Sequence, residues 1–431
     1  MQAAEVTCPA GTVVGISDGV VDTFHSIPFL RTAAPFMDAE PAHTGILIDA
    51  SQPRPDDIAL TITTPAGASD TNDYPVIAYI HGGRFESGTH EDPRADGYAN
   101  ATQGIVQVQI GYRVGLEGFT RFPGDTPHHY RGIDDCNLAL EWIQKNIEAF
   151  GGDPTNVTIV GQSAGATTAL WLARKDHYRG AFRRIVAMSP CFPRQSYDDR
   201  KSDLSFAFGG MRLSRENLSK ASPQRRLRAY KRFRNRHLLD MALGPHPLAP
   251  QEMADVDVVI SSVRDEFYMN PPAQFADRIG LGALFARTLG RAMGIAPGQV
   301  SNWLGDARAM SPRNIAGRLI GDATIRRWVD IVAHEAPGRV WHAELHPDDR
   351  NPADHSRDIR PLFGAKPYSA GEGLNGWLVK YARTGEAGWP EFEKERNQST
   401  LIVDLSGRNA TVAQDPLGYI RQAFARLDSP Q

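Results

Sequence analysis

The sequence predicts an α/β fold with a mostly parallel central sheet, flanking helices and one helical insertion. Apolar runs of strand length alternate with stretches of helical periodicity along the 431 residues, as they do in sheets whose parallel strands are joined by helices. The chain is longer than most domains with a single hydrophobic core, so we expect one domain over 1–431 that is enlarged by an insertion. The long, polar and basic stretch 194–250 is the predicted insertion, a helical cap.

Composition and charge exclude several classes of protein. Apolar content of 41%, charged content of 23% and a net charge of −3 are ordinary for a globular protein and predict no nucleic-acid partner. The cysteines Cys8, Cys136 and Cys191 imply no disulfide framework. The first residues lack the basic and apolar regions of a secretion signal, and no apolar run approaches the length of a membrane span. We therefore expect a cytoplasmic protein without a membrane partner, either a monomer or a homodimer.

The first half of the chain is expected to begin with strands. Alternating residues over 12–29 surround the turn Ser17-Asp18-Gly19 and predict an opening hairpin, whereas 31–57 is rich in Pro, Ala and Asp and predicts a surface loop. Helical spacing and acidic first-turn residues predict a helix over 133–150. Further strands are expected at 58–63, 76–81 and 105–110.

Strands and helices continue to alternate in the second half. A helix start at Ser222-Pro223 supports the helical insertion, and a helical block is expected over 273–336. Strands are expected at 157–160, 183–188 and 257–262, with a final strand at 339–345. A loop over 346–363 and a terminal amphipathic helix over 375–383 complete the prediction.

The most informative stretch runs from Val157 to Gly165, where a β-branched segment breaks into Gly-Gln-Ser-Ala-Gly before helix-forming residues. A strand that turns into a helix within about four residues forces Ser163 into strained backbone geometry, and the flanking glycines let strand and helix approach closely. The Ser163 hydroxyl would then project above the sheet as a nucleophile. A short Gly-x-Ser-x-Gly also fits an ordinary turn with a capping serine, so its surroundings decide between the two.

A serine hydroxyl needs partners before it attacks an acyl carbon at neutral pH. An imidazole must accept its proton, and a carboxylate must orient that imidazole and stabilise its charged form. Asp265 and Glu266 follow the strand expected at 257–262, and loops at the carboxyl ends of parallel strands are where such groups gather. Only one of the two carboxylates can point inward.

Four histidines lie beyond these carboxylates in the chain: His334, His342, His346 and His355. His334 falls in a predicted helix and His342 in a predicted strand, so neither is placed to reach the serine. The pattern leaves His355 and His346, both in the 346–363 loop, as candidates for the base, and either could be an ordinary surface histidine.

The stretch from Phe150 to Gly165 resembles the serine signature of the type-B carboxylesterase and cholinesterase family. Further stretches resemble that family's blocks in the same order: His81-Gly-Gly-Arg-Phe, Tyr112-Arg-Val-Gly, Ala139-Leu-Glu-Trp-Ile-Gln-Lys-Asn-Ile, Val263-Arg-Asp-Glu, His355-Ser-Arg-Asp-Ile-Arg-Pro-Leu-Phe-Gly and Tyr381-Ala-Arg-Thr-Gly-Glu-Ala-Gly-Trp-Pro. The resemblance implies the α/β-hydrolase fold, with Ser163 as nucleophile, Glu266 as triad acid and His355 as general base. It also implies a reaction that needs no cofactor and no metal.

The resemblance further implies an oxyanion hole, which needs hydrogen-bond donors fixed in advance where negative charge develops on the carbonyl oxygen. The matching positions are the backbone N–H groups of Gly83, Arg84 and Ala164. Gly82 would support that turn and, with Gln162, would lie beside the bound substrate. A purely structural glycine turn is the alternative.

Departures from the family's pattern change the charge beside the serine. Arg84 stands where the family has a third glycine, and Gln162 stands where many members have Glu. Both changes make the potential more positive, so we expect cationic esters to be poor substrates and esters that carry an anion to be preferred. In the alternative, Arg84 turns away to a carboxylate such as Glu86 or Glu117 and holds the loop. Ile58 replaces the family's early cysteine, which fits a chain without disulfides.

Together these residues predict a serine hydrolase that cleaves carboxylic esters through an acyl-enzyme. Two other classes are considered: a non-catalytic binding or adhesion homologue of the same fold, and a nucleic-acid binder that uses the basic run 225–236. Binding homologues typically lose a triad residue, and none is lost here. Few aromatic residues interleave with the basic run, so a solvated helix face explains it better.

Overall fold

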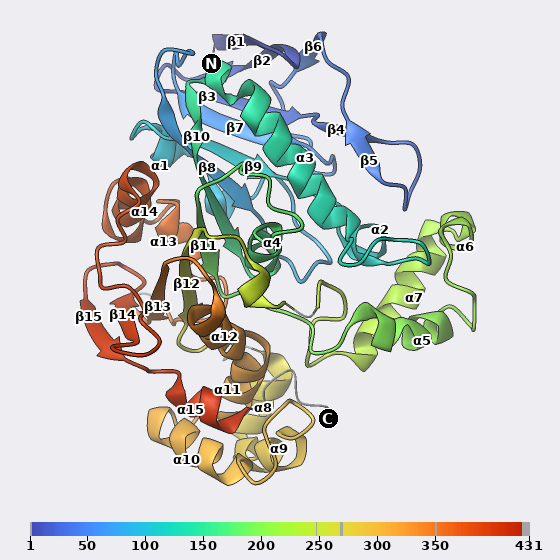
Figure 1. The fold of residues 1–431 in the computed structure, drawn as a ribbon, viewed down its shortest axis with the longest axis vertical. Helices are drawn as coiled ribbons and strands as arrows, with labels where there is room; N and C mark the ends of the chain where they lie inside the picture. Colours follow the sequence, from blue (N-terminus) through green and yellow to red (C-terminus); the bar gives the residue numbers. More distant parts are fainter. Residues whose placement is uncertain (1, 247, 268–269, 350, 425–431) are drawn as a thin grey trace.

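The computed structural model describes residues 2–246, 248–267, 270–349 and 351–424. Within these residues the chain forms a 13-stranded sheet in the order β1-β2-β3-β7-β9-β8-β10-β11-β12-β13-β14-β15, with β6 beside β2, and a two-stranded sheet of β4 and β5. Figure 1 shows the large sheet running through the molecule with helices on both sides. The predicted α/β fold with a mostly parallel central sheet is confirmed.

The centre of the sheet is parallel. Its strands are β8 (Tyr74–Ile80), β9 (Val106–Ile110), β10 (Gly152–Gln162), β11 (Arg184–Met188), β12 (Asp257–Val263), β13 (Val340–His346) and β14 (Ser399–Asp404). Because side chains alternate along a strand, Ile159 enters the core on one face while Val160 enters the core on the other. The carboxyl ends of these strands meet at one edge of the sheet, which is where catalytic loops gather in such folds.

The N-terminal edge of the sheet differs from the prediction. Its strands are β1 (Gln2–Cys8), β2 (Gly11–Ser17), β3 (Val21–Ile27), β6 (Ile46–Asp49) and β7 (Leu60–Pro65). The expected hairpin over 12–29 exists as β2 and β3, but it does not open the fold, because β1 precedes it and pairs antiparallel with β2. The stretch 31–57 is not only a loop, since it contributes β6 and most of the pair β4 (Leu30–Thr32) and β5 (Ala39–Pro41). These strands are short and largely exposed, so they carry little of the alternation that reveals a strand.

The C-terminal edge also corrects the prediction. The strand expected at 339–345 is β13, but it is not the last, because β14 follows in parallel and β15 (Ala410–Gln414) pairs antiparallel with β14. The helix expected at 375–383 is therefore not terminal. It is α14, which crosses from β13 back to β14 and so permits their parallel pairing.

Helices cover both faces of the sheet. α3, α4 and α12 pack into the larger apolar core and α13 and α14 into the smaller one. In Figure 1, α8 to α11 and α15 gather beyond the end of β12 and β13. The helices are α1 (Tyr98–Ala101), α2 (Gly115–Phe119), α3 (Arg131–Asn146), α4 (Ala164–Leu172), α5 (Tyr197–Ala207), α6 (Arg215–Lys220), α7 (Pro223–Arg236), α8 (Pro271–Arg278), α9 (Gly282–Leu289), α10 (Val300–Met310), α11 (Ile315–Gly321), α12 (Arg327–Glu335), α13 (Ile359–Leu362), α14 (Gly373–Thr384) and α15 (Gly418–Ala423). Short 3-10 turns lie at Pro93–Ala95, Ile147–Phe150 and Pro250–Glu252, and a π-helical turn at Asp322–Arg326.

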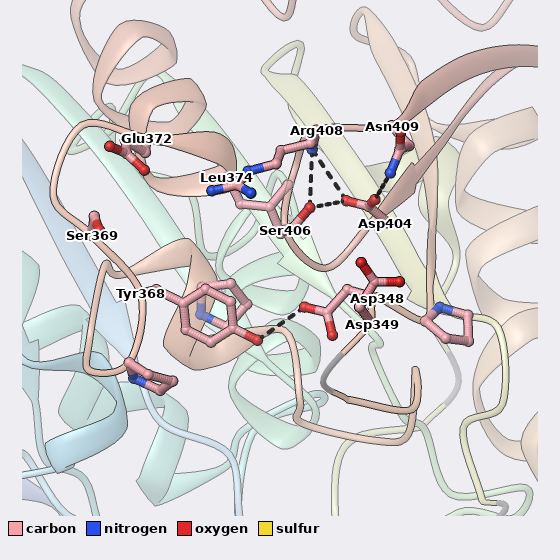
Figure 2. Close-up of a pocket in the computed structure, with 13 residues that line it drawn as sticks. Asp348, Asp349, Tyr368, Ser369, Glu372, Leu374, Asp404, Ser406, Arg408 and Asn409 are labelled. Carbon is pink, nitrogen blue, oxygen red and sulfur yellow. Dashed lines mark hydrogen bonds between the residues drawn. The ribbon is translucent and has the colours of Figure 1, made fainter.

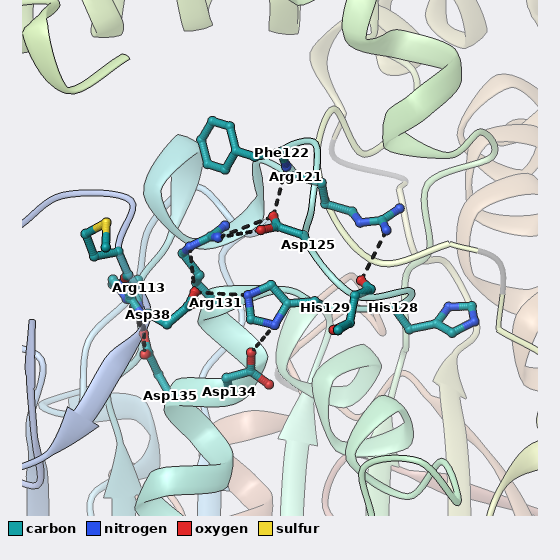
Figure 3. Close-up of polar contacts among 12 residues, drawn as sticks. Asp38, Arg113, Arg121, Phe122, Asp125, His128, His129, Arg131, Asp134 and Asp135 are labelled. Carbon is teal, nitrogen blue, oxygen red and sulfur yellow. Dashed lines mark hydrogen bonds and ion pairs between the residues drawn. The ribbon is translucent and has the colours of Figure 1, made fainter. Parts of the chain in front are cut away.

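The stretch 194–250 contains α5, α6 and α7, which stand to one side of the sheet in Figure 1. Its helices are joined to the loop before α3 by charged side chains. Figure 3 shows the centre of that junction, where the buried Asp125 accepts from the backbone N–H of Phe122 and pairs with Arg131. Arg215 of α6 pairs with the same carboxylate, at the oxygen Oδ1 that Arg131 also contacts. The insertion is thus joined to the rest of the protein through Asp125, which pairs both with Arg131 of α3 and with Arg215 of α6.

Other basic side chains of the insertion also contact the protein. Three further ion pairs cross the junction: Arg121 with Asp198 at 3.1 Å, Arg226 with Glu117 at 3.3 Å and Arg234 with Glu86 at 3.2 Å. Arg236 pairs with Asp203 of α5 at 2.6 Å. Several charges of the 225–236 run are therefore engaged with carboxylates of this chain.

A helix that crosses a bilayer needs about 20 consecutive apolar residues. Among the described residues, none of the helices combines the necessary length and apolar character.

Candidate active site

The turn from β10 into α4 carries Ser163. Ser163 has φ 56° and ψ −120°, a conformation that a non-glycine residue adopts only under strain. The glycines on either side are required by close approach: a Cβ at Gly165 would lie 2.0 Å from the carbonyl oxygen of Ile80, and one at Gly161 would lie 2.4 Å from that of Gly165. The predicted sharp strand-to-helix turn therefore exists and rests on these contacts.

The structure brings Ser163, His355 and Glu266 together. Nε2 of His355 lies 3.0 Å from Oγ of Ser163, and Nδ1 of His355 lies 2.6 Å from Oε2 of Glu266. If Glu266 is ionised it accepts from Nδ1–H, which leaves Nε2 as the acceptor for the serine hydroxyl. Ser163 and Glu266 are almost fully buried, whereas the side chain of His355 keeps 21% of its surface exposed. The hydrogen-bonded line thus runs from the interior towards the surface.

Glu266 is fixed by groups that were not predicted. Its Oε1 accepts from Oγ of Ser189 at 2.7 Å and from the backbone N–H of Val263 at 2.9 Å, while Oε2 is left for His355. Ser189 follows β11 directly and has φ 50°, so a second strained serine lies one strand away from Ser163. In the sequence, Ser189 is marked only as the first residue of the Ser189-Pro190 pair that ends the strand, and nothing there indicates its contact with Glu266.

The alternative carboxylate lies elsewhere. Asp265 accepts from Arg318 at 3.1 Å and from the Asn314 side chain at 3.1 Å, and both of these donors come from the helical block after the insertion. Asp265 therefore faces α11 while Glu266 faces His355.

Electrostatics around His355 favour its protonated form. Burial alone would lower the pKa of His355, but the hydrogen bond from Nδ1 to Glu266 and the negative charge of Glu266 outweigh burial, so the pKa is raised above its usual range. Asp358 and Asp354 add smaller contributions in the same direction. An imidazole with this environment accepts a proton readily and holds it beside the serine.

The other histidines considered are engaged away from Ser163. His342 lies within β13 with Nδ1 at 2.8 Å from the hydroxyl of Thr400, and burial lowers its pKa to about 4. Nε2 of His346 lies 2.8 Å from Glu344, and Nδ1 of His334 lies 2.8 Å from the carbonyl oxygen of Asp330 in its own helix. Of the four candidates, only His355 contacts the serine.

The loop after β8 passes directly over the turn that carries Ser163. A Cβ at Gly82 would lie 2.7 Å from the backbone oxygen of Gln162 and 3.2 Å from Cβ of Ser163. A Cβ at Gly83, where φ is 119°, would lie 2.0 Å from the carbonyl oxygen of Ser87. Both positions therefore require glycine, and the loop is packed tightly against the serine.

Among the described residues, the predicted oxyanion donors have no recorded hydrogen-bond acceptor. In the described part of the chain, no backbone hydrogen bond outside helices and strands uses the N–H of Gly83 or Arg84. Ala164 is the first residue of α4, where backbone N–H groups lack intrahelical acceptors. Arg84 has φ 60° and Phe85 φ 61°, so two non-glycine residues hold left-handed geometry in this loop.

The side chain of Arg84 contacts the 194–250 stretch. Its Nη2 donates to the backbone carbonyl of Asp240 in the insertion at 2.8 Å, and its Nε lies 3.9 Å from Glu86. Glu117, the other carboxylate considered, pairs with Arg226 instead. The arginine therefore holds the loop against the insertion, and the expected anion site on its guanidinium is not supported.

Two more residues flank Ser163. Gln162 is buried, and within the described residues its Nε2 has no hydrogen-bond partner. The Sγ atom of Cys191 lies 3.4 Å from Oγ of Ser163, a contact that was not predicted from the sequence. Burial raises the pKa of the Cys191 thiol to about 11, so it remains a neutral neighbour of the serine.

The residues described contain no group of three or more His, Cys, Asp or Glu side chains that could hold a metal ion. Carboxylates do gather around a cavity of about 360 Å³ near α14, drawn in Figure 2. Figure 2 shows that Asp404 there accepts from Ser406, Asn409 and the backbone N–H of Arg408. Asp404 therefore fixes the turn between β14 and β15.

Similar proteins were found by comparison of sequence and fold. The family model described as the carboxylesterase family matches residues 32–211. The para-nitrobenzyl esterase of Bacillus subtilis is 26% identical over 423 residues, covering 86% of this chain and 83% of that protein. A probable N-octanoylanthranilate hydrolase of Rhodococcus erythropolis is 34% identical over 211 residues, covering 43% of this chain and 46% of that protein. A solved carboxylesterase of Geobacillus stearothermophilus superposes with a TM-score of 0.80 at 21% identity, covering 98% of this chain and 100% of that one.

The order of the sheet, the strand-to-helix turn and the likeness to this solved carboxylesterase show that the chain has the α/β-hydrolase fold. The sequence matches confirm the resemblance to the type-B carboxylesterase and cholinesterase family, and the enzyme class that they establish for the chain is a carboxylic ester hydrolase.

Proposed function

We propose that the chain hydrolyses carboxylic esters through an acyl-enzyme formed on Ser163. The observation that carries this proposal is the continuous hydrogen-bonded line from Oγ of Ser163 through the imidazole of His355 to Glu266. A neutral serine hydroxyl is a weak nucleophile, and a base within hydrogen-bond reach that is itself oriented by a carboxylate overcomes that weakness.

In the acylation step, the serine oxygen attacks the carbonyl carbon while its proton passes to Nε2 of His355. Glu266 stabilises the imidazolium that forms, which agrees with the raised pKa of His355. The imidazolium then gives its proton to the leaving alcohol as the tetrahedral intermediate collapses to the acyl-enzyme. In deacylation, a water oxygen attacks the acyl carbon while Nε2 of His355 accepts the water's proton, and the imidazolium then gives that proton to Oγ of Ser163 as the acid is released.

The negative charge of the tetrahedral oxygen would be held by the N–H groups of Gly83, Arg84 and Ala164. Two observations support this assignment: the loop is packed on the serine turn at Gly82, and the three N–H groups have no other acceptor among the described residues. Each such donor contributes about 10²- to 10³-fold to kcat in comparable sites.

We further propose that residues 194–250 act as a cap that sets the position of this loop. The contact from Arg84 to Asp240 supports the role, as does Gly244, where a Cβ would lie 2.5 Å from the ring of Phe85. The proposed substrates are small carboxylic esters without a requirement for an anion, because the guanidinium of Arg84 already contacts Asp240 and Glu86. A cytoplasmic location is supported by the free thiols of the described cysteines.

Pre-steady-state kinetics with p-nitrophenyl acetate tests the proposal. Wild-type protein is expected to release p-nitrophenolate in a burst equal to the enzyme concentration, followed by slower turnover. Protein quenched during turnover should carry one acetyl group on the peptide that contains Ser163. Acetylation of another residue, or turnover that persists undiminished in Ser163→Ala, would overturn the proposed nucleophile.

A further inference from the structure

A cavity of about 430 Å³ lies where the 194–250 insertion meets the helices that follow it in the chain. Its volume is in the range of small-molecule sites, roughly 300–1,000 Å³. The residues that line it come from the start of the insertion, the end of α7, the loop between α9 and α10, and α12. Of the described residues that line it, none is Ser163, His355 or a proposed oxyanion donor. The cavity is therefore distinct from the proposed ester site.

The charged side chains in the wall of this cavity are basic. Among the described residues, the lining contains no Asp or Glu but four arginines, namely Arg194, Arg200, Arg236 and Arg327. His237 also lines the cavity, but burial and the charge of Arg200 lower its pKa, so near neutral pH the arginines supply the positive charge. Guanidinium groups bind carboxylates and phosphates through paired, charge-assisted hydrogen bonds, so this wall favours an anion.

Three of the four arginines have carboxylate partners in the protein. Nε of Arg194 lies 3.4 Å from Oδ2 of Asp240, and Nη2 of Arg200 donates to the same oxygen. Nη1 of Arg236 donates to Oδ1 of Asp203 at 2.6 Å. These three arginines thus share two carboxylates, and with the fourth arginine the group carries a surplus of two positive charges.

Arg327 is the arginine that lacks a partner. It is only 5% exposed, and among the described residues its guanidinium has neither a hydrogen-bond acceptor nor a carboxylate at ion-pair distance. Its Cζ lies 5.7 Å from the ring centre of Trp328 and 5.5 Å from that of Phe424. Burial and the charge of Arg194 lower the pKa of Arg327 to about 10, so it keeps its charge at neutral pH. A buried charge without an acceptor is unfavourable, and a ligand that supplies one removes that penalty.

The nitrogens of Arg327 are accessible to a ligand in the cavity. In the described part of the chain, Nη1 of Arg194 is shielded from solvent and has no partner, whereas no nitrogen of Arg327 is shielded in this way. Arg327 and Gly294 line the cavity together, and a Cβ at Gly294 would lie 2.6 Å from Nη1 of Arg327. The missing side chain at Gly294 thus leaves room for the guanidinium.

We propose that this cavity binds a small organic phosphate monoester, whose phosphate accepts hydrogen bonds from Arg327 and whose organic group lies against Leu238 and Leu239. A phosphate monoester carries a charge of about −1.5 to −2 near neutral pH and three acceptor oxygens, which suits a surplus of two positive charges on several guanidinium groups. A monocarboxylate offsets only one of these charges. Inorganic phosphate leaves the two leucines of the wall without an apolar partner.

Calorimetry with phenyl phosphate, in a buffer free of phosphate and sulfate, tests the binding without any use of activity. Wild-type protein is expected to bind one molecule, and to bind benzoate and inorganic phosphate about fivefold or more weakly. Equal affinity for benzoate would overturn the match to a dianion, and equal affinity for inorganic phosphate would overturn the role of the organic group. No binding of phenyl phosphate to wild type would overturn the proposal as a whole.

Arg327→Met tests the residue on which the proposal rests. The substitution removes the charge and keeps an apolar side chain, so affinity for phenyl phosphate should fall about tenfold or more. Arg228→Met is the matched control, because it removes one positive charge from α7 at a residue that does not line the cavity, and its affinity should equal that of wild type. Wild-type affinity in Arg327→Met would overturn the site.

Two further measurements test the location without relying on a buried substitution. Asn235→Asp places a negative charge on the cavity wall at an exposed position and should lower the affinity about fivefold; unchanged affinity would mean that the phosphate binds elsewhere. Saturating phenyl phosphate should leave KM for p-nitrophenyl acetate unchanged in wild type, because the cavity is distinct from the ester site. Competitive inhibition would mean that the probe binds beside Ser163 and would contradict the proposal.

Discussion

Arg84 donates a hydrogen bond from Nη2 to the main-chain carbonyl of Asp240 at 2.8 Å, although the two residues are 156 positions apart in the chain. The contact joins the loop that follows β8 to the insertion between β11 and β12. Because the N–H groups of Gly83 and Arg84 are the proposed oxyanion donors, the insertion and the ester site share this link. A hydrogen bond from a charged donor contributes about 1.5–3 kcal/mol.

Loss of this link should slow the chemical step. Arg84→Ala keeps the backbone N–H but frees the loop, so we expect kcat for p-nitrophenyl acetate to fall about tenfold with little change in KM. Arg228→Ala is the matched control, because Arg228 lies on α7 and, among the described residues, its Nε contacts a carbonyl of its own helix at 3.4 Å. A raised KM with unchanged kcat in Arg84→Ala would instead indicate that the side chain binds substrate in the ground state.

The same variant tests whether Arg84 selects anionic esters. The ratio of kcat/KM for a neutral ester and its carboxylate-bearing isostere should be the same in wild type and Arg84→Ala, since the guanidinium contacts Asp240 and Glu86. A direct charge-assisted contact would be worth about 1.5–3 kcal/mol, or roughly ten- to a hundredfold in that ratio. A loss of that size confined to the anionic ester would restore the anion site expected from the sequence.

A methyl group at Gly82 should damage the site without unfolding the protein. The Cβ would lie 2.7 Å from both oxygens of Gln162 and 3.2 Å from Cβ of Ser163, so the loop must move away from the serine. We expect Gly82→Ala to lower kcat about 10²-fold, as the loss of a positioned oxyanion donor does. Gly305→Ala in α10 is the control, because a Cβ there meets no atom within 4 Å. Wild-type kcat in Gly82→Ala would show that the loop's position does not matter.

Paired substitutions test the assignment of base and acid. His355→Ala should lower kcat about 10³-fold or more, while His346→Ala, whose imidazole contacts Glu344, should be nearly silent. Glu266→Gln should be more damaging than Asp265→Asn, since Asp265 pairs with Arg318. The reverse order within either pair, measured on folded variants, would mean that the role belongs to the other residue.

The pH dependence of kcat/KM follows from the environment of His355. A general base acts in its neutral form, so activity is lost as pH falls through the pKa of His355, which is raised above 6.5 by Glu266. We expect an acidic limb with its midpoint above pH 6.5 and expect Glu266→Gln to move that midpoint lower, because the hydrogen-bonded negative charge is removed. An acidic limb that does not respond to Glu266→Gln would belong to a different group.

Site residues that belong to a local sequence pattern could be predicted, whereas site residues whose role depends on a contact with a distant part of the chain could not. The turn at Ser163 can be predicted because strand and helix pack so closely there that positions 161 and 165 must be glycine. Both glycines lie within five residues of sequence, so the pattern is local. Residue-by-residue matching then suggested His355 and Glu266, whose proximity the structure records. Their catalytic roles stay predictions.

Ser189, Cys191 and the direction of Arg84 could not be read in this way. Each depends on a partner far along the chain: Ser189 on Glu266, Cys191 on Ser163 and Arg84 on Asp240. The strand β1 was missed because its residues are mostly exposed and weakly alternating, so pairing with β2 rather than burial defines it. The strand β14 has the β-branched run Thr400-Leu-Ile-Val, which is typical of a strand, but it lies beyond the strand that was expected to be the last.

Labelling with a fluorophosphonate probe tests the proposed nucleophile most directly. Wild-type protein should take up one phosphonyl group, located on the peptide that contains Ser163, and Ser163→Ala should take up none. Cys191→Ala should still be labelled, because the buried thiol next to the serine is held neutral by a pKa of about 11. Folded wild-type protein that is not labelled, or that is labelled equally after Ser163→Ala, would contradict ester hydrolysis through an acyl-enzyme on Ser163.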